Sequence, residues 1–146
     1  KKSMQIRVVK HGEPFHFEAF NEDGLSVHMD ASPEIGGENK GVRPMQMIIM
    51  GLGGCSGIDV CNILKKQKQV FSDFSININA KRRDNPEPKI FEHIVIEFVF
   101  EGEKLDKLKA KRAVDLSIEK YCSVSEILRQ SATLEYKVIV NKEIIA

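Results

Sequence analysis

Short stretches in which apolar and polar residues alternate make up most of the N-terminal part of the chain. Residues 5–9, 15–20 and 25–30 follow this pattern, and a period of two is typical of a strand with one buried face. The segments between them, residues 11–14 and 21–24, contain the glycine, proline and asparagine that hairpin turns favour. The sequence therefore predicts an antiparallel meander of three strands.

Apolar residues then follow one another without alternation, starting just after Pro44. A proline is well suited to the first turn of a helix, because its missing N–H has no partner there, so we expect a helix over residues 44–67. The first half of this helix is apolar on nearly every face, which predicts a position in the core. Gly51, Gly53 and Gly54 each disfavour a helix by about 1 kcal/mol relative to alanine. They predict the close approach of another backbone, and we infer a partner helix there.

The second half of the chain returns to alternation and then changes to helical spacing. Residues 74–81 and 94–100 alternate on either side of a proline-rich turn, which predicts an antiparallel pair with one solvated face. Apolar residues at helical spacing among charges predict a surface helix over residues 104–120. A short helix over residues 123–130 and a closing strand over residues 134–140 complete the chain. The order βββ, α, ββ, αα, β predicts an α+β fold.

Length and composition narrow the class of protein. We expect one domain, residues 1–146, because a chain of this length buries about 70% of the surface that its unfolded form exposes. A net charge of +1 gives no reason to expect a nucleic-acid partner.

The N-terminal residues show neither the apolar segment nor the cleavage site of a secretory signal. The longest apolar run, residues 47–52, is well short of the roughly 18 residues that a membrane span needs. We therefore expect a protein that is neither secreted nor bound to a membrane.

The chain contains three cysteines, an odd number in a protein too large to need disulfides for stability. This predicts a reducing compartment, the cytoplasm, where thiols stay free. Any disulfide that forms is then expected to be functional and reversible.

Cys122 is the cysteine with a local reason to react. A thiol reacts as its thiolate, which a helix N-terminus favours. Cys122 directly precedes the predicted short helix, so we expect unpaired backbone N–H groups to lower its pKa, with Ser123 or Ser125 sharing the capping. The plainer interpretation, which applies to every cysteine of the chain, is a small buried apolar side chain.

Cys55 lies inside the long helix, with Asp59 one turn later on the same face. In a dry site beside a carboxylate, a reactive Cys55 requires a positive group from elsewhere. Arg43 and Arg7 are the nearest candidates by position. Asp59 has two interpretations. It forms a hydrogen bond near the site, or it is an acidic residue with a structural role in the helix or at a dimer contact.

The remaining polar candidates have plainer interpretations. Cys61 lies about 240° around the helix from Cys55, which excludes a C-x-x-C pair and predicts a core position. Glu126 is expected to be solvated or to take part in capping. The four histidines lack the spacing of metal ligands, so we expect no metal site and no cofactor. These histidines are His11, His16, His28 and His93.

Two segments carry a resemblance to a known family. Residues 44–55 run from a proline through apolar and small residues to a cysteine, and residues 112–124 form a predicted surface helix that ends in Tyr-Cys-Ser-Val. They resemble the two cysteine motifs of the osmotically inducible protein C and organic hydroperoxide resistance (OsmC/Ohr) family, with most likeness to its YhfA-like branch. The resemblance extends in topology over about residues 4–140. It implies two antiparallel sheets around a long central helix, in an intertwined homodimer with two sites at its interface.

The same resemblance implies a thiol peroxidase. Cys55 attacks an organic hydroperoxide or binds another small apolar ligand, Cys122 condenses with the oxidised Cys55, and a small or protein dithiol reduces the resulting disulfide. Met45, however, occupies the place where the family's peroxidases have a glutamate, and residues 31–34 lack the arginine that pairs with it. Arg43 is a candidate substitute.

Two functional hypotheses follow. The first is thiol-dependent reduction of organic hydroperoxides in oxidative-stress defence. The second, favoured by Met45, is a non-enzymatic dimer that retains Cys55 and Cys122 for redox sensing or for binding a small ligand.

Overall fold

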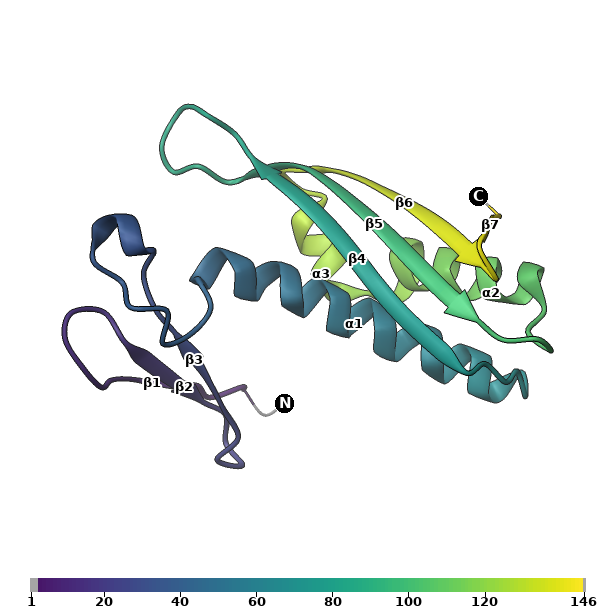
Figure 1. Cartoon of the computed structure of the whole chain (residues 1–146), viewed down its shortest axis with the longest axis horizontal. Coiled ribbons are helices and arrows are strands. Elements are labelled where there is room, and N and C mark those ends of the chain that lie inside the picture. The colour runs from purple at the N-terminus through teal and green to yellow at the C-terminus, as the bar shows by residue number, and fades with distance from the viewer. Residues whose placement is uncertain (1–2, 146) are drawn as a thin grey trace. The chain divides into compact units, whose positions relative to one another are not determined.

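The computed structural model describes residues 3–145, and the chain divides between Ile48 and Ile49 into two compact units. The N-terminal unit contains strands β1 (Arg7–Lys10), β2 (Phe17–Phe20) and β3 (Ser26–Met29), which form an antiparallel sheet in that order (Figure 1). The predicted meander is confirmed, although its strands are shorter than predicted. At the second turn the Asn21 side chain accepts hydrogen bonds from two backbone N–H groups, and Gly24 has a φ of 79°.

A buried carboxylate organises the loop after β3. Asp30 accepts hydrogen bonds from the backbone N–H groups of Ala31, Glu38 and Lys40 at 2.7, 3.1 and 3.1 Å. Burial acts to raise the pKa of Asp30, but these hydrogen bonds outweigh it and hold the pKa below its ordinary value of 3.8. The loop also contains the short 3₁₀ turn η1 (Pro33–Ile35).

Helix α1 (Pro44–Lys66) begins at the predicted proline and ends one residue before the predicted boundary. Its first turn is closed by Gln46, whose side-chain oxygen accepts the backbone N–H of Arg43 at 2.9 Å. By length and composition alone α1 is apolar enough to cross a membrane. This is weak evidence, since core helices of soluble proteins have the same properties.

The C-terminal unit contains a sheet in the order β4 (Asp73–Arg82), β5 (Phe91–Glu101), β6 (Thr133–Val140) and β7 (Glu143–Ile144). Strands β4 and β5 are antiparallel as predicted, but β5 and β6 are parallel, so the expectation of two antiparallel sheets was wrong for this one. The reason is the connection: the chain returns to the starting end of β5 through a helical crossover, and such crossovers join parallel strands. The short β7 was not predicted.

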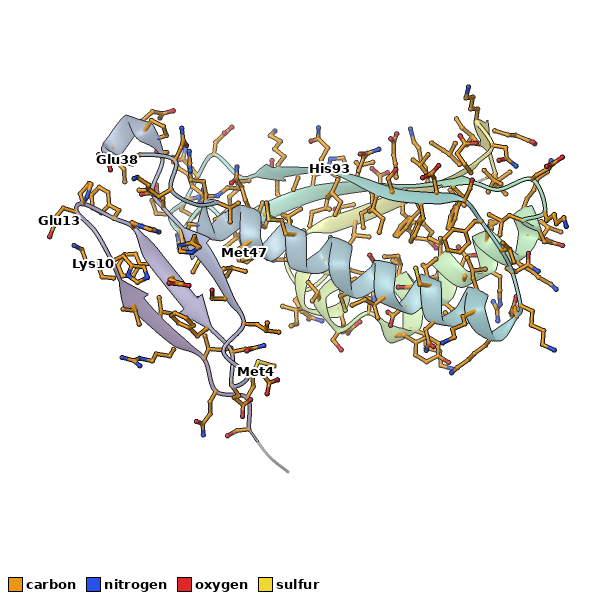
Figure 2. The ribbon with its side chains drawn as sticks, turned by 60° about the horizontal axis from the view of Figure 1, so that its bottom comes forward. Met4, Lys10, Glu13, Glu38, Met47 and His93 are labelled. Atoms are coloured by element: carbon orange, nitrogen blue, oxygen red, sulfur yellow. The ribbon has the colours of Figure 1, made fainter. Side chains whose placement is uncertain are left out.

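One face of this sheet is dry and the other is solvated, as the alternation predicted. Ile94, Ile96, Phe98 and Phe100 of β5 are fully buried. Both Figure 1 and Figure 2 show the helices of the C-terminal unit on one side of the sheet, whereas His93 lies on the opposite side and contacts Glu135 at 2.7 Å.

The crossover between β5 and β6 consists of α2 (Lys107–Leu116), the π-helical turn η2 (Ser117–Tyr121) and α3 (Ser123–Leu128). Asp106 caps α2 by accepting the backbone N–H of Lys109. The π-helical turn has no counterpart in the sequence pattern, which predicted one continuous helix. Such turns insert a residue into a helix and are frequent at functional sites.

Helix α1 buries only one stripe within the C-terminal unit. Leu52, Ser56, Val60 and Leu64 are fully buried, at the i, i+4 spacing of one helix face. Met50 and Ile58 are 51% and 72% exposed. The predicted core position is confirmed for this stripe, while other apolar side chains of the helix stay exposed in the single chain.

The glycines of α1 fall into two groups. A Cβ added to Gly53 or Gly57 would lie 3.4 or 3.1 Å from an isoleucine side chain of β4, so these two allow the strand to approach closely. A Cβ added to Gly51 or Gly54 would have no neighbour within 4 Å. The predicted close approach therefore occurs at Gly53, but towards a strand of the same chain.

Candidate functional site

The fold of the C-terminal unit brings the two candidate cysteines together. Cys55 comes from the middle of α1, and Cys122 connects η2 to α3. Their sulfur atoms and a carboxylate oxygen of Asp59 all lie within 4.8 Å of one another. Cys122 is 3% exposed, while Cys55 and Asp59 are half-buried. The result is a pair of thiols beside one carboxylate, shielded on one side and accessible on the other.

Cys122 occupies the capping position that the sequence predicted, but its acidity is not as predicted. Its Sγ accepts the backbone N–H of Ser125 at 3.4 Å, and the Ser125 hydroxyl donates to the Cys122 carbonyl oxygen at 2.9 Å. Burial nevertheless raises the pKa of Cys122, an effect to which the neighbouring Cys55 adds. The predicted lowering of this pKa was wrong, because removal from water outweighs the backbone and side-chain interactions with Ser125 that act to lower it.

Asp59 is held in place by a residue that the sequence analysis missed. Ser117, fully buried at the start of η2, has its Oγ 3.1 Å from Asp59 Oδ2 and 3.3 Å from the carbonyl oxygen of Ser56. The hydroxyl therefore links the π-helical turn to α1 at the site. The available signal was a serine at a position of the helix where the pattern expects an apolar residue.

A pocket with a volume of about 500 Å³ opens beside Asp59. Asn62 and Lys66 line it from α1, and Leu116 and Tyr121 line it from the crossover. This volume is in the range of small-molecule sites in proteins.

Cys61 lies away from this site and is exposed, so its predicted core position was wrong. It lines an apolar pocket of about 750 Å³ between α1 and β4, together with Met50, Ile58 and side chains of the strand. Partial burial removes water from the Cys61 thiol and so raises its pKa.

The proposed activating groups belong to the N-terminal unit. Arg43 donates hydrogen bonds to the carbonyl oxygen of Gly41 and to Asn39 Oδ1, at 3.1 and 2.6 Å. Arg7 lies in β1, and Met45 is half-buried in the first turn of α1. A role for either arginine at Cys55 stays a prediction.

The other polar candidates form local contacts. Glu126 is exposed and pairs with Arg129 at 2.9 Å, as expected for a solvated residue. His28 bridges Glu18 and His16, with contacts of 3.6 and 2.8 Å, and His11 also contacts Glu18. This cluster joins neighbouring strands, and spacing along the sequence could not reveal it.

The fold and the site together define an α+β protein with two thiols and a carboxylate at the junction of its long helix and a helical crossover. The family model described as OsmC-like protein matches residues 37–137. Protein YhfA of Escherichia coli K12 is 37% identical over 133 residues, which cover 91% of this chain and 95% of that protein. The chain belongs to the OsmC-like family.

Two solved structures extend this comparison. A hypothetical protein from Aquifex aeolicus VF5 is 31% identical, with a TM-score of 0.78 over 97% of this chain and 99% of that one. An organic hydroperoxide resistance protein OsmC from Legionella pneumophila is 20% identical, with a TM-score of 0.67 over 94% and 96% of the two chains. The second likeness is one of fold.

Proposed function

We propose that this protein reduces organic hydroperoxides through a cycle in which Cys55 and Cys122 alternate between two thiols and a disulfide. The observation that carries the proposal is the separation of the two sulfur atoms, within 4.8 Å, although 67 positions (122 − 55) separate the residues in the chain. The family includes proteins named for organic hydroperoxide resistance, and the cysteine of each motif is present here as Cys55 and Cys122.

The cycle has three balanced steps. The Cys55 thiolate attacks one peroxide oxygen, the O–O bond breaks, and the departing alkoxide takes up a proton to leave as an alcohol, while Cys55 becomes a sulfenic acid. The Cys122 thiol then attacks the Cys55 sulfur, which forms the disulfide and releases water. An external dithiol reduces the disulfide and is itself oxidised.

Cys55 is the attacking residue in this proposal, and Cys122 resolves. Cys122 is almost fully buried, so it is less able than Cys55 to meet a substrate and suits a second step that follows oxidation of its neighbour. Cys55 is more accessible than Cys122, and Asp59 beside it lines a pocket of small-molecule size. Asp59 places a carboxylate oxygen within 4.8 Å of both sulfur atoms, a separation that one bridging water can span for proton transfer.

The working form that we propose is a homodimer. Met50 and Ile58 expose apolar surface on α1, and Gly51 and Gly54 leave open space above the helix backbone. Large exposed apolar side chains beside small residues suit the close packing of a second helix.

A second candidate function is redox sensing without rapid turnover. The raised pKa of Cys122 favours it, because a thiol that is mostly protonated resolves a sulfenic acid slowly. Met45 in place of an acidic residue favours it as well.

The decisive assay supplies the purified protein with a dithiol and then with cumene hydroperoxide or hydrogen peroxide. We expect rapid, repeated consumption of cumene hydroperoxide, slower consumption of hydrogen peroxide, and none above background for Cys55→Ser. Consumption of a single equivalent without turnover would establish the sensor instead. Equal consumption by wild type and Cys55→Ser would refute both candidates.

A further inference from the structure

The donor atoms at the candidate site also suit a metal ion. Cys55 Sγ, Cys122 Sγ and one oxygen of Asp59 lie within 4.8 Å of one another. A tetrahedral Zn²⁺ with bonds of about 2.3 Å to sulfur holds two thiolates about 3.8 Å apart. The two sulfurs therefore need to close by about 1 Å at most, and each sulfur and the carboxylate oxygen by about 1.3 Å at most, to share one ion. Two thiolates and a carboxylate are ligands that Zn²⁺ accepts, with a fourth position left for water or another small ligand.

Metal binding would concentrate negative charge at this site. A bound pair of thiolates and a carboxylate would carry three negative charges close together, in a place where Cys122 is removed from water. Within residues 3–145, none of the ion pairs to a lysine, arginine or histidine involves Asp59. A divalent cation bound by the three donors would offset this charge.

Ser117 and Ser125 interact with two of the three donor residues, as the residues that orient the ligands of a metal site do. The Ser117 hydroxyl lies 3.1 Å from Asp59 Oδ2, which fixes the orientation of the carboxylate. The backbone N–H of Ser125 donates to Cys122 Sγ, and such a hydrogen bond stabilises a thiolate ligand. Asp59 also lines a pocket, and Cys55 is half-buried, so solvent reaches two of the three donor residues.

We propose that the reduced protein binds one Zn²⁺-like divalent ion per chain through Cys55, Asp59 and Cys122. The proposal rests on the same pairing of thiols as the proposed function and replaces the expectation from sequence that no metal site exists. It gives Asp59 a definite role as a ligand, one that a dithiol cycle alone does not require.

Binding of the ion and formation of the disulfide exclude each other, because both use the same two sulfur atoms. If a hydroperoxide oxidises the loaded site, the two thiolates give up two electrons and join as the disulfide. The hydroperoxide takes up those electrons and two protons and leaves as an alcohol and water, and the ion is released. The metal would thus protect the thiols and make the cycle sensitive to metal supply.

The test uses Co²⁺ as a spectroscopic probe. The full chain is reduced, freed of reductant and chelator under argon, and titrated with Co²⁺ while absorbance is recorded. We expect thiolate-to-cobalt charge-transfer absorption in the near ultraviolet, d–d bands typical of tetrahedral cobalt, saturation at one equivalent per chain, and loss of both on addition of Zn²⁺.

Four variants make the result specific. Cys55→Ser and Cys122→Ser should each remove most of the charge-transfer absorption. Ser117→Ala should weaken Co²⁺ binding by about 10-fold or more, as loss of outer-shell partners commonly does. Cys61→Ser, which changes a cysteine of the same helix that lies outside the site, should bind like wild type. Thermal unfolding of each variant without metal shows whether it is folded.

Absence of charge-transfer absorption in wild type at millimolar Co²⁺ would overturn the proposal, as would equal absorption in folded Cys55→Ser. Hydroperoxide consumption, measured on the same preparations with a chelator present, keeps the two proposals apart. Consumption without cobalt binding leaves the peroxidase standing and removes the metal site. Cobalt binding without consumption does the reverse.

Discussion

Helix α1 carries a cysteine on each of two flanks, and the surroundings of these cysteines differ sharply. On the site flank, Cys55 and Asp59 face Cys122 and the π-helical turn. On the groove flank, Cys61 faces β4 across an apolar pocket, beside Gly53 and Gly57. The buried stripe from Leu52 to Leu64 separates the two flanks.

The difference shows that exposure alone does not make a cysteine a candidate for thiol chemistry. Cys61 is the most exposed cysteine of the chain, yet the pocket that it lines is apolar and its pKa is raised. Cys55 is less exposed but has a second sulfur and a carboxylate within 4.8 Å. A dithiol cycle depends on the partner atoms that the fold places next to the thiol.

The largest expected effect is on peroxide turnover, which should depend on the site flank and not on the groove flank. Cys122→Ser should turn over cumene hydroperoxide at least about tenfold more slowly than wild type, because only the external dithiol can then resolve the Cys55 sulfenic acid. Cys61→Ser should turn over within about twofold of wild type, since surface substitutions usually change free energies by no more than about 0.5 kcal/mol. Peroxide consumption with excess dithiol measures both. Continued turnover by Cys122→Ser at the wild-type rate would contradict the assignment.

The buried stripe of α1, from Leu52 to Leu64, should contribute a large share of the free energy of unfolding. Leu64 is fully buried, so Leu64→Ala should lower the free energy of unfolding by about 2–5 kcal/mol through lost contacts and the remaining cavity. Leu108→Ala is the matched control, because Leu108 is 73% exposed and should change stability by less than about 0.5 kcal/mol. Urea titration gives both values, and equal losses would mean that the stripe is not the core.

The exposed surface of α1 should matter for assembly. Ile58→Lys introduces a charge into the apolar surface that we assign to the dimer, and it should shift the protein from dimer to monomer. Leu108→Lys places the same charge at a residue of nearly equal exposure on α2 and should leave the mass unchanged. Sedimentation equilibrium distinguishes the two variants. If Ile58→Lys remains a dimer, the interface does not include this surface of α1.

The smallest expected effect is a pH dependence on the groove flank. The pKa of Cys61 is raised in the folded protein above its ordinary value of 9.0. The corresponding contribution to stability is therefore fully present at neutral pH and is lost as the pH rises through 9.0 and above. Cys61→Ser should lose less stability than wild type over this interval, as measured by urea titration. Parallel curves would contradict the assignment, and the effect is small because water screens an exposed thiol.

Local patterns predicted most of the fold. Alternation located the strands, and Pro44 marked the start of α1 because its geometry fits a first helical turn. The parallel pairing of β5 with β6 depends on where the crossover returns, which alternation within a strand does not encode.

The site was predictable in its cysteines but not in its surroundings. Cys55 and Cys122 stood out through their motifs. The contact between Ser117 and Asp59 joins residues 58 positions apart through a π-helical turn that has no sequence signal. Cys61 and the acidity of Cys122 were misjudged for a related reason: burial is decided by tertiary packing, and packing sets both exposure and the loss of hydration that moves a pKa.

The most direct test of the central claim is to map the bond that forms on oxidation. Reduced protein is treated with one equivalent of cumene hydroperoxide, digested without reductant and analysed by mass spectrometry. We expect a loss of two hydrogens per chain and a single cross-linked pair of peptides that contain Cys55 and Cys122 of the same chain. A disulfide to Cys61, a bond between two chains, or a stable sulfinic acid at Cys55 with Cys122 unmodified would contradict the account.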